Sequence, residues 1–454
     1  MSFDTVIRNA TVVFPDSGER AADIGIRDGS ITAIMARGET LGDVGEVIDA
    51  SGLHLFPGLI DAHLHFGFAD SDTEYASETF YAAQGGVTTA VAYFLSSDPY
   101  AELFAAARSE CEAQSYIDFA FHFSACTEPH ITEMEKYVRE YGVTSFKYFM
   151  NFKGEEGRYM GLDGTDDGYF HDLLVESARI GRPMIVCHTE NIEMVSRIRR
   201  RYQSAGKASF RDYCESKPPI TEAENLSRAA YLADKTGARV YIPHVSTAMA
   251  IDDARPWKER SGDLWLETCP HYLTHHMEMD LDSLYKANPP LRSPDDLEAV
   301  WAALADGTID VIGADHVARK RATKDKPIWQ ATQGFPGTAT ILPVLLSEGY
   351  HKGRISLQRI AQIFSRNPAR LFDLPASKGD IAVGCDADLT LVDLQHEHVV
   401  DPAELGSYAD HSAYEGWLLK GWPMRTIVRG VTIMHEHRVT GSSGHGRYIE
   451  RRLQ

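Results

Sequence analysis

The feature that most constrains the fold is the alternation of short apolar runs with longer helical patterns along the middle of the chain. Eight apolar runs lie near Leu55–His65, Thr88–Phe94, Asp118–Ala125, Ser145–Met150, Met184–Glu190, Arg239–Ser246, Leu264–Pro270 and Asp310–His316. Helical patterns lie between them, for example over Ala101–Glu112, Phe170–Ile180, Glu222–Lys235 and Asp295–Ala305. Such alternation is typical of parallel βα units. Eight units predict an α/β protein with a closed (β/α)8 TIM barrel over residues 56–374.

The two ends of the chain have a different sequence pattern from the middle. Residues 1–55 and 375–440 alternate apolar and polar residues in short runs, which are broken by turn residues such as Asp28-Gly29. This pattern predicts short strands, and we expect them to form one small β-sandwich domain built from both ends. The C-terminal tail, 441–454, has too little apolar pattern to form a unit of its own. Our hypothesis is that it packs on a neighbouring subunit.

Composition excludes several classes of partner. The chain has 454 residues and a net charge of −20, and phosphate binding requires a positive face, so we expect no nucleic-acid partner. No apolar run approaches the ~18–20 residues of a membrane span, and the N-terminus lacks a signal-peptide pattern. The six cysteines form no Cys-x-x-Cys pair. They predict reduced thiols and a cytoplasmic protein.

Polar residues stand at the exits of the predicted strands. His63 and His65 are two residues apart, so they project to the same side of one strand. The further exit residues are Lys147, His188, His244 and Asp315. The C-terminal ends of barrel strands meet at one rim. A single histidine there would more often be a hydrogen-bonded structural residue, but all six together favour a site for two divalent metal ions.

Lys147 is the unusual member of this set, because an ammonium group is repelled by two nearby cations. A neutral lysine could serve as a general base. Alternatively, CO2 could convert it to a carbamate (N6-carboxylysine), whose two oxygens could bridge both metals. The sequence leaves both possibilities open.

These motifs resemble the amidohydrolase superfamily. The relevant segments are Asp61-x-His-x-His65, Phe-Lys147, His188-x-Glu-Asn191, His244-Val-Ser, Pro-Pro-Leu-Arg292, Asp315-His, Asn367-Pro-Ala-Arg-Leu-Phe372 and Tyr414-Glu-Gly416. They cover nearly the whole chain, and they are similar to the cyclic-amidase branch of dihydropyrimidinases, hydantoinases, allantoinases and dihydroorotases. The resemblance implies a barrel with a small β-sandwich and, commonly, a homotetramer.

The resemblance also implies a ligand set and a mechanism. His63, His65 and Asp315 would hold one zinc ion, and His188 and His244 the other, with carbamylated Lys147 and a hydroxide bridging them. Manganese or cobalt would fit the same ligands. The bridging hydroxide would attack a cyclic amide carbonyl. Asp315 would take its proton as general base and return it, as general acid, to the leaving ring nitrogen.

Four departures from the family pattern bear on the substrate. Dihydroorotases have an arginine where this chain has Gly67, which disfavours a ring that carries a carboxylate. Dihydropyrimidinases and hydantoinases have a tyrosine that binds the oxyanion, whereas this chain has Phe152, with Tyr159 as a possible substitute. Asn288 and Gln333 replace a serine and an asparagine. We therefore expect a neutral cyclic amide, imide or ureide, bound near Phe152, Tyr159, Asn288 and Gln333.

Three alternatives remain from the sequence. An allantoinase would share every metal ligand. A non-catalytic, dihydropyrimidinase-related assembly protein is disfavoured because all six ligands are present. An aminohydrolase acting on an exocyclic amine is disfavoured by Lys147, which many such enzymes lack.

Overall fold

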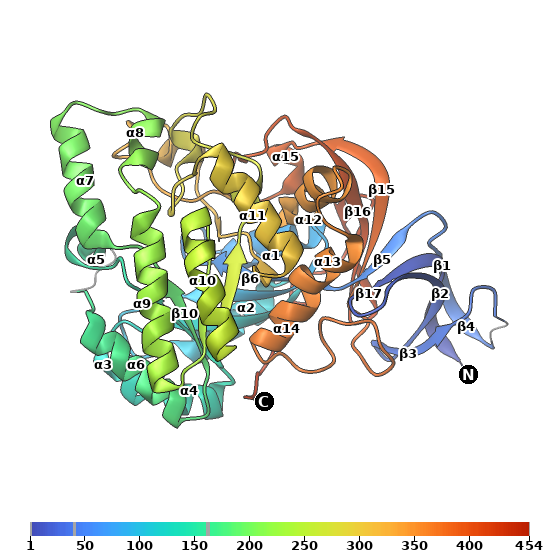
Figure 1. The fold of residues 1–454 in the computed structure, drawn as a ribbon. Coiled ribbons are helices and arrows are strands. Elements are labelled where there is room, and N and C mark those ends of the chain that lie inside the picture. Colours follow the sequence, from blue (N-terminus) through green and yellow to red (C-terminus); the bar gives the residue numbers. More distant parts are fainter. Residues whose placement is uncertain (1, 40–41, 160–163, 454) are drawn as a thin grey trace.

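The computed structural model describes residues 2–39, 42–159 and 164–453, and they form two sheets and a set of surrounding helices (Figure 1). The first sheet has the strand order β13-β12-β11-β10-β9-β8-β7-β6-β14. Its strands are β6(Leu59–His65), β7(Val87–Phe94), β8(Asp118–Ser124), β9(Ser145–Phe149), β10(Met184–His188), β11(Val240–Ile242), β12(Leu264–Thr268), β13(Val311–Ile312) and β14(His316–Val317). Every neighbouring pair in it is parallel. The predicted fold class is confirmed.

The eighth barrel strand is interrupted, which the sequence did not predict. Within 311–317, β13 pairs with β12 while β14 pairs with β6, so this broken strand closes the ring. At the break, a Cβ on Gly313 would lie 2.7 Å from both Glu267 Oε2 and the Cβ of His63. The next residue, Ala314, donates its N–H to Asp61 Oδ1 at 3.2 Å. The chain leaves the strand here and places Asp315 at the barrel rim.

Helices lie around the barrel and also beside the second sheet (Figure 1). They are α1(Glu74–Gln84), α2(Phe104–Gln114), α3(Glu128–Thr132), α4(Met134–Tyr141), α5(Gly154–Tyr159), α6(Asp167–Arg179), α7(Ile192–Ser204), α8(Phe210–Glu215), α9(Ile220–Thr236), α10(Ala248–Ser261), α11(Pro294–Asp306), α12(Ile341–Val344), α13(Leu357–Ala361), α14(Asn367–Leu371) and α15(Pro402–Leu405). Alternation along β10 explains the packing, because Ile185 joins helix residues such as Leu173 in one hydrophobic cluster. Its neighbours Met184 and Val186 belong to a separate cluster of barrel residues.

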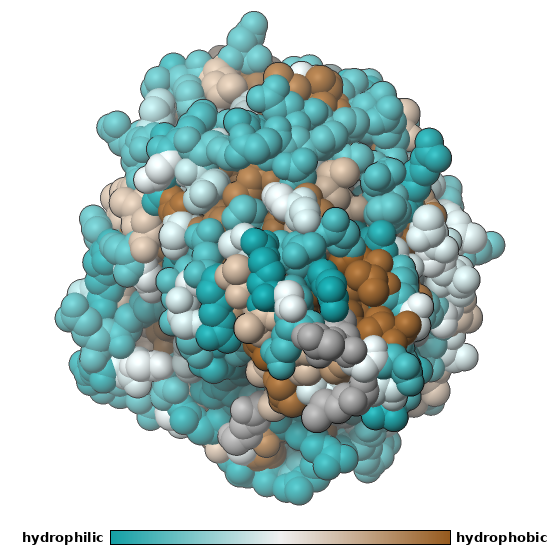
Figure 2. Space-filling view, turned by 90° about the vertical axis from the view of Figure 1, so that its right-hand side faces the viewer, coloured by the Kyte–Doolittle hydropathy of each residue, from teal (hydrophilic) through white to brown (hydrophobic). Residues whose placement is uncertain are grey.

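The second sheet combines both ends of the chain. Its order is β18-β17-β16-β15-β5-β1-β2-β3, with β4 beside β1. The strands are β1(Phe3–Phe14), β2(Gly18–Arg27), β3(Ser30–Met35), β4(Val44–Asp49), β5(His54–Pro57), β15(Leu389–Val399), β16(Leu418–Val428), β17(Val431–His435) and β18(Arg438–Val439). The blue and red strands meet where β5 runs antiparallel to β15 (Figure 1). Seen from the side of this sheet, the surface is mostly hydrophilic, with small hydrophobic patches (Figure 2).

The predicted strand Leu55–His65 is in fact two strands that belong to different sheets. Gly58 separates β5 from β6, and its N–H donates to the carbonyl of Asp388 at 2.7 Å. A Cβ on Gly58 would lie 2.3 Å from Thr88 Oγ1. Only glycine permits this close approach, so Gly58 is the point at which the two sheets are joined.

The C-terminal tail packs on the barrel of its own chain. Ile449 N donates to the carbonyl of Phe119 at 2.7 Å, and Phe119 N donates to the carbonyl of Arg447 at 3.0 Å, which adds the tail to β8. Arg451 is buried and donates to Ser145 Oγ at 2.8 Å. Among the described residues, no helix is long and apolar enough to cross a membrane.

Candidate metal and substrate site

A cavity of about 460 Å³ lies where the barrel strands end, and all six predicted ligand residues line it. His63 and His65 come from β6, Lys147 from β9, His188 from the end of β10, His244 from the segment after β11, and Asp315 from the break between β13 and β14. The structure therefore brings together side chains that are far apart in the sequence. It does so at the end of the barrel that the strand-exit pattern predicted.

Three of the six form a compact group. Asp315 Oδ1 lies 3.0 Å from His63 Nε2 and 3.2 Å from His65 Nε2. One ligand atom from each of these residues lies within 4.8 Å of the others, which is close enough to hold one ion. The rings of His188 and His244 are 4.5 Å apart, and the His244 ring is 5.4 Å from that of His63. The second pair of histidines thus adjoins the first group.

Glu267, on β12, fixes the orientation of His63. Its Oε1 lies 2.5 Å from His63 Nδ1, and its Oε2 accepts a hydrogen bond from the hydroxyl of Tyr241 at 2.6 Å. A carboxylate that accepts Nδ1–H leaves Nε2 with a lone pair, and this is the usual support of a metal-bound histidine. Sequence reasoning missed Glu267. The available signal was a carboxylate inside the apolar strand Leu264–Thr268, because such a residue needs a partner.

The backbone at two of the six residues adopts an unusual conformation. His244 has φ +45° and Asp315 has φ +51°, and non-glycine residues seldom adopt such values. Strained residues of this kind concentrate at functional sites. Here they turn the side chains inward just as each strand ends.

Burial and the neighbouring carboxylates set the charge of the candidate ligands. Burial lowers the pKa of His65 to about 4, and it also lowers the pKa of His188 and His244, which favours the neutral imidazole that binds metals. At His63 burial acts in the same direction, but the charges of Glu267 and Asp315 raise the pKa to about 9. Burial lowers the pKa of Lys147 to about 8, although Asp315 opposes this shift. For Asp315, burial acts to raise the pKa, but the charge and hydrogen bonds of the histidines hold it well below its usual range.

The donor set fits divalent cations. His65 Nδ1 and His188 Nε2 are buried and have no hydrogen-bond partner among the described residues, and the neighbour of His63 Nε2 is the Asp315 carboxylate at 3.0 Å. Burying an unpaired polar nitrogen is unfavourable, so such atoms indicate an additional partner. Cys269 forms a second group with His63 and Glu267, but burial raises the pKa of its thiol well above the usual value. In the absence of a metal ion this direction favours the protonated thiol.

The structure places three of the four predicted substrate contacts in the cavity. Phe152, Asn288 and Gln333 line it, and the Phe152 ring stacks on Phe149 with centroids 4.1 Å apart. Tyr159 ends α5, but its side chain lies outside the described residues. Asn151 was not predicted. It is buried and lines the cavity, so an amide stands next to the phenyl ring of Phe152, which offers no donor.

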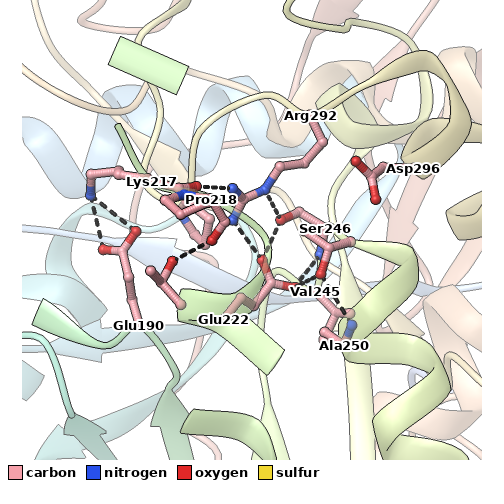
Figure 3. A network of polar contacts seen from close by, with 12 residues as sticks. Glu190, Lys217, Pro218, Glu222, Val245, Ser246, Ala250, Arg292 and Asp296 are labelled. Carbon is pink, nitrogen blue, oxygen red and sulfur yellow. Dashed lines mark hydrogen bonds and ion pairs between the residues drawn. The ribbon is translucent and has the colours of Figure 1, made fainter. Parts of the chain in front are cut away.

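A buried polar network supports the loops around the cavity (Figure 3). Arg292 donates to Ser246 Oγ and to Glu222 Oε2, both at 2.9 Å. Lys217 pairs with Glu190 Oε2 at 2.9 Å and also donates to Asn288 Oδ1. The motif that ends at Arg292 therefore holds segments after β10 and β11 in place and does not line the cavity.

Comparisons with known proteins agree with this geometry. The profile of the Amidohydrolase family matches residues 189–433. An allantoinase of Rubrobacter xylanophilus is 35% identical over 456 residues, covering 99% of this chain and 98% of the relative. A D-hydantoinase of Ralstonia pickettii is 32% identical and covers 99% of both chains. A solved D-hydantoinase structure superimposes with a TM-score of 0.91 at 31% identity and covers 99% of each chain. A dihydropyrimidinase structure from Brevibacillus agri gives a TM-score of 0.90 at 28% identity, with the same coverage of both chains.

Proposed function

This chain belongs to the amidohydrolase family and is a hydrolase of cyclic amide C–N bonds, and on that premise we propose that it opens a hydantoin- or dihydropyrimidine-like ring with the help of two divalent metal ions. The observation that carries the proposal is the convergence of six predicted ligand side chains in one cavity at the barrel rim. In this proposal residues 56–374 form the catalytic unit.

The ligand assignment follows the grouping of the side chains. His63, His65 and Asp315 would hold one ion, because their ligand atoms already form a compact group. His188 and His244 would hold the other. Zinc is the first choice for such a histidine-rich set.

Lys147 would join the two ions as a carbamate. Its lowered pKa supports this, because at neutral pH an appreciable fraction of the amine is uncharged, and the uncharged amine is the form that reacts with CO2. The side chain is buried in the cavity with Nζ 4.6 Å from the centre of the Tyr93 ring. In the ammonium form it would repel the cations, whereas the carbamate carries a negative charge.

When bound, the metal ions would lower the pKa of water and polarise the substrate carbonyl. Asp315 would accept the proton of the attacking water as the new C–O bond forms. It would then deliver that proton to the ring nitrogen as the C–N bond breaks, because an amide nitrogen leaves poorly without protonation. Glu267 would keep His63 in the required tautomer throughout.

Allantoinase activity is the second candidate, because relatives with that name are among the most similar proteins found. Both candidates predict release of a ureido acid, whereas an aminohydrolase would release ammonia.

A substrate panel tests the proposal. Metal-loaded enzyme is assayed with dihydrouracil, hydantoin, 5-aryl hydantoins, allantoin and succinimide, with separate detection of the ring-opened acids (ureido acids, or succinamic acid from succinimide) and of ammonia. Ring opening of a hydantoin or dihydropyrimidine supports the proposal, and ring opening of allantoin alone would favour the second candidate. Release of ammonia without ring opening would contradict both.

The proposal also includes a cytoplasmic location and assembly as a homotetramer. The six cysteines are free thiols in the structure, which agrees with a reducing compartment such as the cytoplasm. Exposed apolar side chains such as Tyr231 on α9 and Leu418 on β16 offer surface for subunit contacts. Light scattering would support a homotetramer if it gave four times the chain mass of 50.5 kDa.

A further inference from the structure

Three cationic side chains line the cavity in addition to the candidate metal ligands. When the six ligand residues are set aside, the lining described by the structure includes Arg199, Lys286 and Arg319 but no aspartate or glutamate. The whole chain has the opposite balance, with 65 acidic residues against 45 lysines and arginines. Arg199 and Lys286 have other partners in the chain, so Arg319 is the cation of this lining to consider for a ligand.

Arg319 is the member of this set that is placed to meet a substrate. It follows β14 at the C-terminal end of the eighth strand, where barrel enzymes carry their specificity residues. Its guanidinium carbon lies 4.8 Å from the centre of the Phe68 ring, and that ring contacts the ring of His65 edge-on at 5.8 Å. One aromatic ring therefore separates the guanidinium from a candidate metal ligand.

Arg319 packs on the Phe68 ring but lacks a charged partner in the described part of the chain. Among the described residues its guanidinium forms no ion pair with a carboxylate, and its buried Nε has no hydrogen-bond partner. The neighbouring Arg321, by contrast, pairs with Glu415. A partly buried arginine without an anionic partner is unfavourable unless a ligand supplies the anion.

We propose that Arg319 is a specificity-determining residue that binds a carboxylate on the substituent of the substrate ring. Phe68 would hold the guanidinium plane by stacking, and the planar fork would bind the carboxylate with two hydrogen bonds. This inference rests on the proposed ring-opening function and names its substrate class, a hydantoin- or dihydropyrimidine-like ring with an acidic side group. Gly67 led us to expect a neutral substrate, but Arg319 offers a cation close to that loop from a different strand.

Two probes of the same size isolate the carboxylate. Hydantoin-5-acetic acid and hydantoin-5-acetamide share the ring and differ only in the charge of the side group. For the metal-loaded enzyme at low salt, we expect kcat/KM to be at least about ten times higher for the acid, because hydrogen bonds to charged groups contribute differences of this order. The preference should lie mainly in KM and should shrink as salt is added.

Substitutions of Arg319 test whether this side chain causes the preference for the acid over the amide. Arg319→Gln should lower the acid-to-amide ratio of kcat/KM by about ten- to a hundred-fold, and Arg319→Lys should retain part of the ratio. The matched control is Arg321→Gln, which removes an arginine from the same loop but not from the cavity, and it should keep the wild-type ratio. If Arg319→Gln does not fold, the ratio of the wild-type enzyme and its salt dependence still decide the question.

A wild-type enzyme that opens the acetamide as well as or better than the acid would overturn the carboxylate site and leave the proposed function intact. An equal fall of the ratio in the Arg319 and Arg321 variants would also overturn it. Failure to open either probe, or hydantoin itself, would instead contradict the proposed function on which the inference rests.

Discussion

At the scale of single residues, the candidate site depends on carboxylates that orient its imidazoles. His63 is held between Glu267, 2.5 Å from Nδ1, and Asp315, 3.0 Å from Nε2. Only Asp315 stands at a strand exit. Glu267 acts from behind the histidine, so its effect and that of Asp315 can be separated by mutation.

Glu267→Gln should weaken metal binding. The amide cannot accept Nδ1–H of His63 as a charged partner, and loss of such a partner typically lowers metal affinity by about 10- to 100-fold. Competition with a chromogenic chelator measures the affinity, and exposed Glu259→Gln is the control. Metal affinity equal to that of the wild type would show that Glu267 only fills space.

Asp315→Asn should slow ring opening by orders of magnitude while the remaining ligands keep much of the metal. Loss of a general acid–base group typically costs about 10²- to 10⁴-fold in rate. The test is kcat together with the metal content of the variant, and Asp325→Asn in the following exposed loop is the control. Turnover near that of the wild type would remove Asp315 from the proton transfers.

At the scale of elements, the C-terminal tail and the loops after the strands make buried polar contacts that hold the barrel together. The tail runs along β8, and the network of Arg292 and Lys217 joins the loops that follow β10 and β11 (Figure 3). These contacts are polar and buried. They should therefore be visible in stability measurements.

Arg451→Ala should destabilise the protein by about 3 kcal/mol, because it removes buried charge-assisted hydrogen bonds and leaves their acceptors unpaired. Its guanidinium donates to Ser145 Oγ at 2.8 Å and to the carbonyls of Phe372 and Phe121. Urea denaturation measures the loss. Exposed Arg452→Ala should have almost no effect, and equal effects of the two substitutions would contradict a structural role for the docked tail.

Glu190→Gln should show a pH-dependent loss of stability. Burial raises the pKa of Glu190, but Lys217 and His188 outweigh it and lower the pKa to about 2. A depressed pKa stabilises the fold above the unfolded value of about 4.5, and this contribution is lost as pH falls toward 2. The difference from the wild type should be about 3 kcal/mol at pH 7 and about 1.4 kcal/mol smaller near pH 3.5. A difference that does not change between pH 7 and pH 3.5 would contradict this assignment.

At the scale of the whole molecule, the sequence predicted what depends on local pattern. The apolar runs predicted the barrel strands. The C-terminal ends of these strands meet at one rim, so the sequence also predicted that His63, Lys147 and His244 share one site. Glu267 and Arg319 were missed because their roles depend on which side chains face them across the barrel. The break at Gly58 and the docking of Arg451 were missed for the same reason, since each depends on a contact with a distant segment.

The second sheet is joined directly to the barrel strand that carries two candidate ligands. β6 carries His63 and His65 and follows β5 of the other sheet after one glycine. One hydrophobic cluster contains residues of both sheets, such as Phe56 of β5 and Leu64 of β6. The second sheet thus anchors the strand that presents the first two candidate ligands.

The most direct test of this account is metal content measured on enzyme whose activity is known. Elemental analysis of purified, ring-opening enzyme should return about two divalent metal ions per chain, and removal of the metal with a chelator should abolish turnover until metal and bicarbonate are restored. Full turnover by protein that contains no bound metal would contradict the account.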